Sequence, residues 1–155
     1  MERKTKINAE EGKQDLMIIR EFDLPVDLLF KAYEEAEIVQ QWMGTKVLKL
    51  ENKKYGGFQF ETSDAKGNVV FKAHGTIHEF NPNQQIVRTF EMENAAFGVQ
   101  LEFLEFIALT ADTSKLNMQI IYKSVDLRDQ MLKLPFEYGL NMAHSRLQEV
   151  VLKLK

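Results

Sequence analysis

Residues 136–155 carry the clearest hydrophobic pattern in the sequence. Apolar side chains recur every three or four positions, which places them on one stripe of an α-helix. Pro135 favours a helix start here, because proline is tolerated at the first helical position. Lys153 and Lys155 lie near the end, where positive charge complements the helix dipole. The predicted stripe comprises Phe136, Leu140, Ala143, Leu147, Val150, Val151 and Leu154.

From residue 45 to residue 124 the pattern changes to an alternation of apolar and polar positions, which is typical of β-strands. Turn-forming residues interrupt the alternation, and the short connections that they make indicate an antiparallel sheet. A further apolar strand precedes Pro25. The predicted strands lie at 16–22, 45–52, 58–62, 69–80, 85–93, 99–110 and 115–124.

Three shorter helical segments complete the prediction. Pro25 opens one short helix, and a second spans about 36–43 and stops at Gly44. Asp126 is the expected N-cap of a short helical turn at 127–132. The elements together predict an α+β fold, in which a curved antiparallel sheet of about six or seven strands wraps around the long C-terminal helix. The two short helices after the first main strand are expected to support the sheet instead of forming a crossover between parallel strands.

Residues 1–13 are weakly patterned, and two interpretations stay open for them: a short edge strand near residues 4–8, or a mobile arm. Residues 14–155 are expected to form a single domain, which suits a chain of this length.

Composition narrows the classes of function. The chain has 155 residues, 45% of them hydrophobic and 28% charged, and a formal net charge of −3. This balance gives no indication of a nucleic-acid-binding face. The absence of cysteine excludes disulfides, thiolate metal sites and a cysteine nucleophile. No apolar run suggests a signal peptide or a membrane helix, so a cytoplasmic location is expected, with no membrane partner.

Five short blocks carry a resemblance to a known family. They are REFDLP at 20–25, QWMG at 41–44, YGGF at 55–58, HGTI at 74–77, and the segment 139–147. In this order and spacing they resemble the activator-of-heat-shock-protein-ATPase-like branch of the START-like (birch-pollen-allergen, SRPBCC) superfamily. The resemblance implies a helix-grip fold, in which the sheet grips the long helix. The family's tryptophan pair followed by glycine and proline stands here as Trp42, Met43, Gly44 and Thr45.

Aromatic and methionine side chains from several elements suggest a cavity between the long helix and the sheet, although core packing alone also explains them. The small pair Gly139 and Ala143 favours the cavity, because glycine inside a helix costs about 1 kcal/mol relative to alanine. Either a strand packs unusually close there, or space is left open. The candidate ligand-binding residues are Trp42, Met43, Phe58, Phe60, Phe71, Phe103, Met118, Tyr122, Gly139, Met142 and Ala143.

Two of the three histidines could share a metal only on a helix. His74 and His78 flank Gly75, Thr76 and Ile77, which favour a strand and would separate the two rings by roughly 13 Å. Solvated strand histidines are therefore predicted, and no metal or other cofactor is expected.

Three further charged or titratable residues have uncertain orientation. His144 lies beside the apolar stripe, so it is expected at the surface or at the border between the buried and exposed sides of the helix. Glu105 shares its parity with apolar neighbours, so either it points inward with a raised pKa, or a β-bulge returns it to solvent, which we favour. Arg20 likewise lies among apolar neighbours. Its side chain is expected either to find a polar partner in the interior or to extend its charged end to solvent at the rim of the sheet.

No nucleophile elbow, P-loop or dinucleotide fingerprint occurs, so no catalytic residue is assigned. The leading hypothesis is non-catalytic binding of a small, largely apolar ligand in the cavity. A cyclase- or hydrolase-like enzyme that uses Glu105 or His144 is one alternative, and a chaperone-interaction module, implied by the family resemblance, is another. Exposed edge strands also leave a homodimer open.

Overall fold

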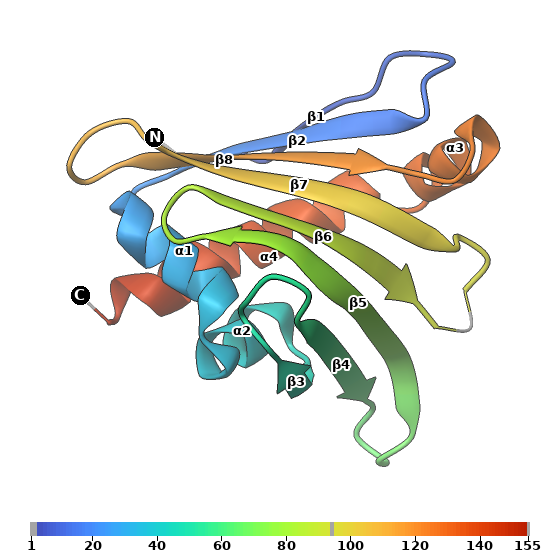
Figure 1. Cartoon of the computed structure of the whole chain (residues 1–155), viewed down its shortest axis with the longest axis horizontal. Coiled ribbons are helices and arrows are strands. Elements are labelled where there is room, and N and C mark those ends of the chain that lie inside the picture. Colours follow the sequence, from blue (N-terminus) through green and yellow to red (C-terminus); the bar gives the residue numbers. More distant parts are fainter. Residues whose placement is uncertain (1–2, 94, 155) are drawn as a thin grey trace.

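The computed structural model describes residues 3–93 and 95–154. Within them the strands form one antiparallel sheet, which runs in the order β1-β2-β8-β7-β6-β5-β4-β3 (Figure 1). The strands are β1 (Lys6–Asn8), β2 (Asp15–Phe22), β3 (Lys46–Leu50), β4 (Gly57–Ser63), β5 (Val69–Asn81), β6 (Gln85–Met92), β7 (Val99–Ala108) and β8 (Ser114–Ile121).

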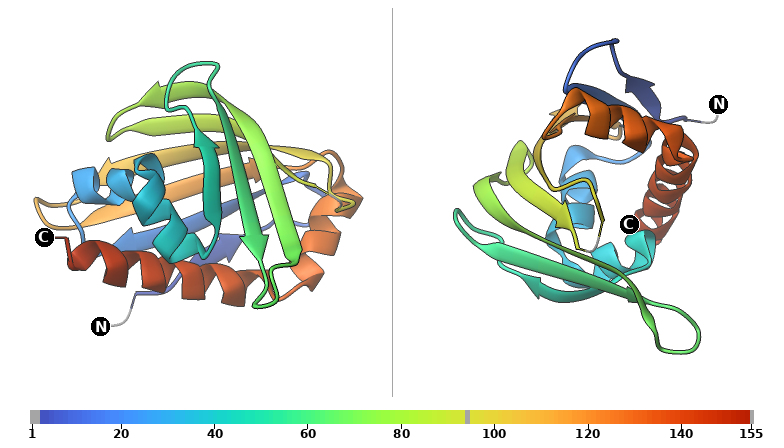
Figure 2. Two further views of the ribbon diagram at one scale, coloured as in Figure 1. Left: turned by 90° about the horizontal axis from the view of Figure 1, so that it is seen from below. Right: turned by 90° about the vertical axis from the view of Figure 1, so that its right-hand side faces the viewer.

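The sheet curves around the C-terminal helix, which lies along its concave side (Figure 2). Two short helices follow β2 and close one end, and a third precedes the long helix. The helices are α1 (Val26–Glu34), α2 (Ala36–Met43), α3 (Val125–Lys133) and α4 (Phe136–Leu152). The α+β helix-grip fold predicted from the sequence is therefore confirmed, with eight strands among the described residues instead of six or seven.

The additional strand is β1, so the short edge strand, one of the two interpretations left open for the N-terminal segment, is the one observed. Ile7 lies opposite Ile18, so the segment pairs with the edge of β2. Thr5, just before β1, is buried although it is polar. Its backbone N–H donates to the side chain of Asn141 on α4 at 2.9 Å, which ties the N-terminal segment to the long helix.

The apolar stripe of α4 faces the sheet, but it is shorter than predicted. Leu147 and Val151 are fully buried, whereas the remaining helical members of the stripe are half-buried. Leu154 is 54% exposed, because the helix ends at Leu152 and the chain turns away. Its inclusion in the stripe was wrong. Lys155 lies outside the described residues.

The caps of the shorter helices differ in one respect from the prediction. Gly44 ends α2 in the left-handed conformation at φ 65°, as expected for a glycine stop. The N-cap of α3, however, is Ser124, whose hydroxyl accepts from the N–H of Leu127 at 3.1 Å. Asp126 lies in the first turn, so the N-cap prediction was wrong by two residues.

Glycine permits close packing within the sheet at Gly75. A Cβ there would overlap the carbonyl oxygen of Thr89 and come within 2.6 Å of the ring of Phe58. Phe58 and Phe60 consequently pack into a second core cluster between β4, β5 and β6, next to the main core under α4.

Candidate functional site

A cavity of about 310 Å³ lies between α4 and the concave face of the sheet. Its floor comes from β2, β5, β6, β7 and β8, its roof from α4, and its walls from the three shorter helices. Most of the lining is apolar, with methionines contributed by four elements or their ends. The volume is at the lower end of the range that holds a drug-sized molecule. The four α4 residues that line it are Phe136, Leu140, Ala143 and His144.

The structure brings together some of the sequence-predicted cavity residues and disperses the others. Phe58 and Phe60 are buried in the neighbouring core cluster. Phe103 lies on the opposite face of β7, and Met142 is 48% exposed on α4. The predicted residues that line the cavity are Trp42, Met43, Phe71, Met118, Tyr122 and Ala143.

Of the two interpretations of Gly139, open space is the one that the structure shows, but this space is at the surface and is not the cavity. Gly139 is exposed, and no atom lies within 4 Å of the position that its Cβ would take. No strand packs against it, and the residue is not part of the cavity lining. It precedes Leu140 and Ala143 on the helix, so it lies beside the lined region of α4.

The floor of the cavity contains a buried ion pair that the sequence analysis missed. The Nε of Arg88 donates to Oε1 of Glu102 at 2.8 Å, and the Glu102 side chain is only 3% exposed. Nε2 of Gln100 donates to Oε2 of the same carboxylate at 2.7 Å. The guanidinium of Arg88 also lies over the rings of Phe58 and Phe90, 5.1 and 5.6 Å from their centroids. Both oxygens of the carboxylate thus have a donor.

Tyr122, the residue directly after β8, continues this polar strip. Leu101 lies opposite Ile121 in the β7–β8 register, and continuing that register by one residue brings Tyr122 beside Gln100. Tyr122 is 2% exposed, and its hydroxyl has no hydrogen-bond partner among the described residues. Burial, with the charge of Glu102, raises the pKa of Tyr122 well above its ordinary value, so the phenol stays protonated.

His144 lies in the roof of the cavity and not at a surface, so the prediction of a boundary position was wrong. The ring is 1% exposed and packs edge-on against Phe22 at 5.7 Å. Its Nδ1 lies 2.7 Å from the hydroxyl of Thr5, which also accepts from Arg20. That arrangement favours a Thr5 hydroxyl that donates to Nδ1 and a proton on Nε2. Burial, with the charge of Arg20, lowers the pKa of His144 to about 3, so the ring is neutral at pH 7.

Glu105 is exposed, but a bulge does not cause this. The pairing of β7 with β6 and β8 runs without a register shift, so the favoured bulge was wrong. The inward face of β7 carries the even-numbered residues Gln100, Glu102, Leu104 and Phe106. Both parities of this strand contain large apolar residues, so the alternation alone did not show which face was inside.

Arg20 points inward, as one of its two interpretations predicted. It is buried, donates to the Asn141 side chain at 2.9 Å, and lies over the ring of Phe22. It belongs to the β1–β2–α4 junction and is not part of the cavity lining.

The remaining histidines lie on β5. His74 is flanked by Glu91 and Glu93, each 3.2 Å from one ring nitrogen. His78 is exposed and meets the ring of Tyr55 edge-on. In residues 3–93 and 95–154, no group of three or more His, Cys, Asp or Glu is arranged to hold a metal ion.

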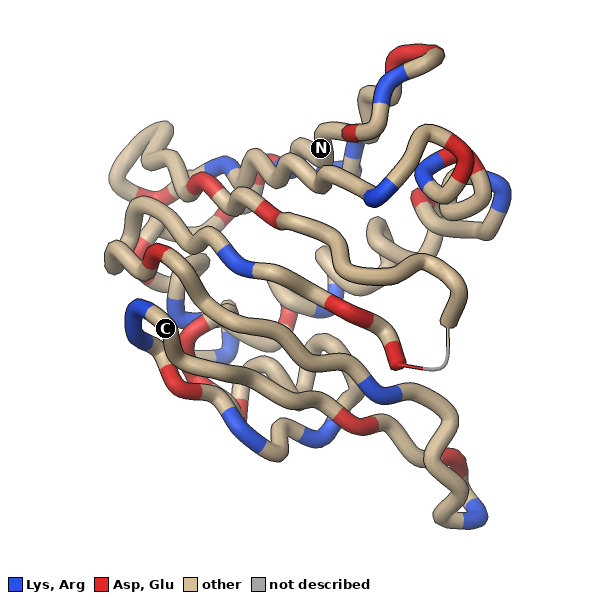
Figure 3. Tube along the Cα trace, turned by 45° about the vertical axis from the view of Figure 1, so that its right-hand side comes forward, with Lys and Arg blue, Asp and Glu red and all other residues tan. Residues whose placement is uncertain are grey.

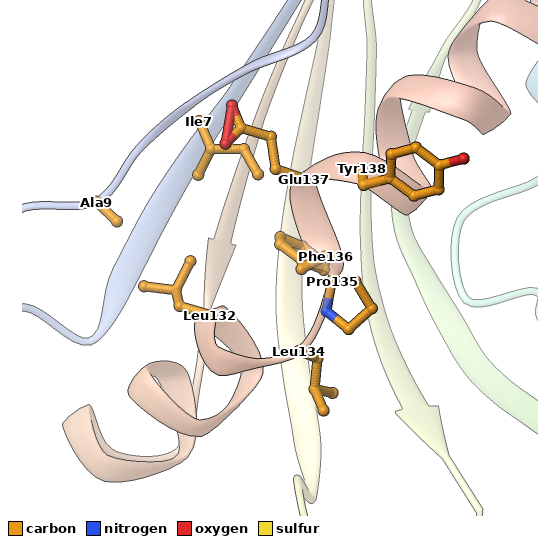
Figure 4. Close-up of a pocket in the computed structure, with 8 residues that line it drawn as sticks. All are labelled: Ile7, Ala9, Leu132, Leu134, Pro135, Phe136, Glu137 and Tyr138. Carbon is orange, nitrogen blue, oxygen red and sulfur yellow. The ribbon is translucent and has the colours of Figure 1, made fainter.

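A second hollow lies outside the sheet grip, between the N-terminal segment, α3 and the start of α4 (Figure 4). Its volume is larger, about 410 Å³, but exposed residues such as Leu134 and Tyr138 form much of it. Phe136 lines both hollows. The inner cavity is the better candidate site, because it alone combines apolar walls with the buried Arg88–Glu102 pair.

Positions of both charge signs are mixed along the trace of the described residues in the view of Figure 3, where Lys and Arg are interspersed with Asp and Glu. Within the described part of the chain, no helix is both long and apolar enough to cross a membrane.

Comparison with known proteins gives the family. A family model described as activator of Hsp90 ATPase homolog 1-like protein matches residues 23–151. The chain belongs to this family. The resemblance inferred from the sequence blocks is therefore confirmed. No curated protein matches the sequence.

Solved structures share the helix-grip fold of this chain at low sequence identity. A Rhodobacter sphaeroides protein superposes with a TM-score of 0.83 at 16% identity, covering 96% of this chain and 99% of that one. A Nitrosomonas europaea protein has a TM-score of 0.78 at 18% identity, covering 96% and 100%. A Mycobacterium smegmatis protein has a TM-score of 0.81 at 15% identity, covering 94% and 95%. These likenesses establish the fold alone.

Proposed function

We propose that this protein binds a small, largely apolar molecule in the cavity between α4 and the sheet, without catalysing its conversion. The observation that carries the proposal is the cavity of about 310 Å³ with apolar walls and a short strip of polar groups on its floor. Ligand pockets commonly have this composition, in which the apolar surface provides affinity and a few polar groups fix orientation.

The state of the titratable groups in the cavity supports binding over catalysis. Glu102 accepts from Arg88 and from Gln100, so its carboxylate already has a donor at each oxygen. His144 is neutral and engaged by Thr5 at Nδ1. Neither arrangement resembles a nucleophile paired with an adjacent base, which is what covalent catalysis requires. Glu105, the carboxylate first considered for chemistry, lies on the outer face.

The proposal is tested by filling the cavity. In Ala143→Phe, the added ring would occupy space next to Leu140 and His144, because Ala143 lies in the roof. Displacement of a neutral apolar dye such as Nile red is the measurement. We expect dye affinity to fall at least tenfold, which corresponds to about 1.4 kcal/mol.

Met142→Phe is the matched control, because Met142 adjoins Ala143 in sequence but is exposed and does not line the cavity. Dye affinity should be unchanged in this variant. Native mass spectrometry of gently purified protein adds a search for a co-purified molecule. Equal dye binding by both variants and the parent protein would overturn the proposed site.

A further inference from the structure

The polar side chains on the floor of the cavity also indicate which polar group the ligand carries. This inference rests on the proposed function. Of the side chains on the floor, the Tyr122 hydroxyl is the buried polar group that lacks a hydrogen-bond partner among the described residues. A buried hydroxyl without a partner costs about 1–3 kcal/mol, so a ligand that supplies the partner gains that free energy on binding.

The charge of the lining restricts what that partner can be. Arg88 and Glu102 neutralise each other at 2.8 Å, and their remaining neighbours in the lining are uncharged. His144 adds no positive charge at pH 7, since its pKa is lowered. A charged ligand group would therefore lose its hydration without gaining a free counter-ion, which is costly.

The protonation state of Tyr122 sets the polarity of the contact. The raised pKa keeps the phenol neutral, and a phenol presents a strong O–H donor. Its neighbour Glu102 already accepts from two donors. The complementary ligand group is therefore an acceptor oxygen without a charge.

We propose that the ligand is an uncharged, largely apolar molecule with a carbonyl oxygen, and that the Tyr122 hydroxyl donates a hydrogen bond to this oxygen. Phe90 and Met118, which also line the cavity, hold the apolar part of the molecule, while the Arg88–Glu102 pair stays closed beneath it. Tyr122 is then a specificity-determining residue that selects ketones or related neutral carbonyl compounds from hydrocarbons and carboxylates of the same size.

Three probes with one skeleton test this: acetylnaphthalene, ethylnaphthalene and naphthoate, which present a carbonyl, a hydrocarbon and an anion. Each is titrated against bound Nile red in the parent protein and in Tyr122→Phe. We expect acetylnaphthalene to bind the parent about fivefold to tenfold more tightly than ethylnaphthalene. In Tyr122→Phe the ketone should fall to the level of the hydrocarbon, whose own affinity should not change.

The outcomes separate the two proposals. If Nile red does not bind the parent protein, or binds Ala143→Phe equally well, the proposed function is overturned together with this inference. If the dye binds in the cavity and none of the three probes displaces it, only this inference is overturned. Equal affinity of the ketone and the hydrocarbon, or tightest binding of naphthoate, would overturn this inference alone.

A denaturant melt checks the premise and the folding of the variant. Removing a hydroxyl that has no partner should leave the midpoint of Tyr122→Phe unchanged or raised. A clearly lowered midpoint would mean that the hydroxyl has a partner within the protein, which contradicts the inference.

Discussion

The buried Arg88–Glu102 pair allows a quantitative test of how dry the cavity floor is. Arg88→Met leaves the Glu102 carboxylate, with only 3% of its side chain exposed, without its cation. Removing one partner of a buried pair costs about 3–5 kcal/mol, because the other charge stays buried and uncompensated. Glu102→Leu should cost a similar amount for the opposite reason. Both costs are large beside the total stability of a domain, about 5–15 kcal/mol.

The double variant, Arg88→Met with Glu102→Leu, should be far more stable than the sum of the single changes predicts. It removes both buried charges, which is often neutral or stabilising by about 1–4 kcal/mol. It also loses the cation–π contacts to Phe58 and Phe90, about 1 kcal/mol, and leaves the amide of Gln100 without its acceptor, about 1–3 kcal/mol. These contributions largely cancel, so the double variant should lie within about 2 kcal/mol of the parent protein.

Urea denaturation of the four proteins at pH 7 measures this cycle, and the expected coupling energy is about 4 kcal/mol or more. The exposed pair Arg3–Glu21, at 2.9 Å, is the matched control, and its coupling should be within about 0–1 kcal/mol. Single changes at Arg88 and Glu102 that each cost less than about 1 kcal/mol and add without coupling would refute the reasoning. They would mean that water entering through the cavity screens the pair.

Two further predictions concern α4. The pKa of His144, lowered to about 3 by burial, means that the unfolded chain, with a pKa near 6.5, binds a proton which the folded protein does not. The contribution of the neutral His144 ring to the free energy of unfolding is therefore complete above about pH 6.5 and is lost as pH falls toward 3. The free energy of unfolding should accordingly drop by about 2 kcal/mol between pH 7 and pH 5. His144→Gln should remove that part of the slope in pH-dependent urea melts, and identical slopes would contradict a neutral buried ring. Gly139→Ala should raise the stability by about 0.5–1 kcal/mol, because the position is helical and open around the Cβ. Thermal melts measure this change, and in them Gly75→Ala, whose Cβ would overlap the Thr89 carbonyl, should lower the stability of the protein. A Gly139→Ala variant that is less stable than the parent would contradict the open space around this position.

Local patterns in the sequence were sufficient to determine the longer strands, the helices and their architecture, but not the short edge strand β1. The period of two from residue 45 onward and the helical stripe before residue 152 follow from how side chains alternate along a strand and recur around a helix. Gly44 determined the end of α2, because a left-handed residue there suits glycine. The order of these elements, with short turns, was enough to indicate a sheet that wraps around the last helix.

Local patterns did not determine which face of a strand is inside when both faces carry apolar residues. In β7 the odd positions contain Phe103 and Ile107, and the even positions contain Leu104 and Phe106. Only the pairing of β7 with its neighbours directed Glu102 inward and Glu105 outward. The cavity residues were therefore predicted in part, and its buried ion pair was missed.

His144 and Gly139 show the same limit on α4. The N-terminal segment covers His144 through Thr5, a contact between residues 139 positions apart that no helical pattern encodes. Gly139, a turn earlier, meets nothing within 4 Å. Periodicity determines which residues share a side of a helix, but burial and protonation depend on what distant parts of the chain place against that side.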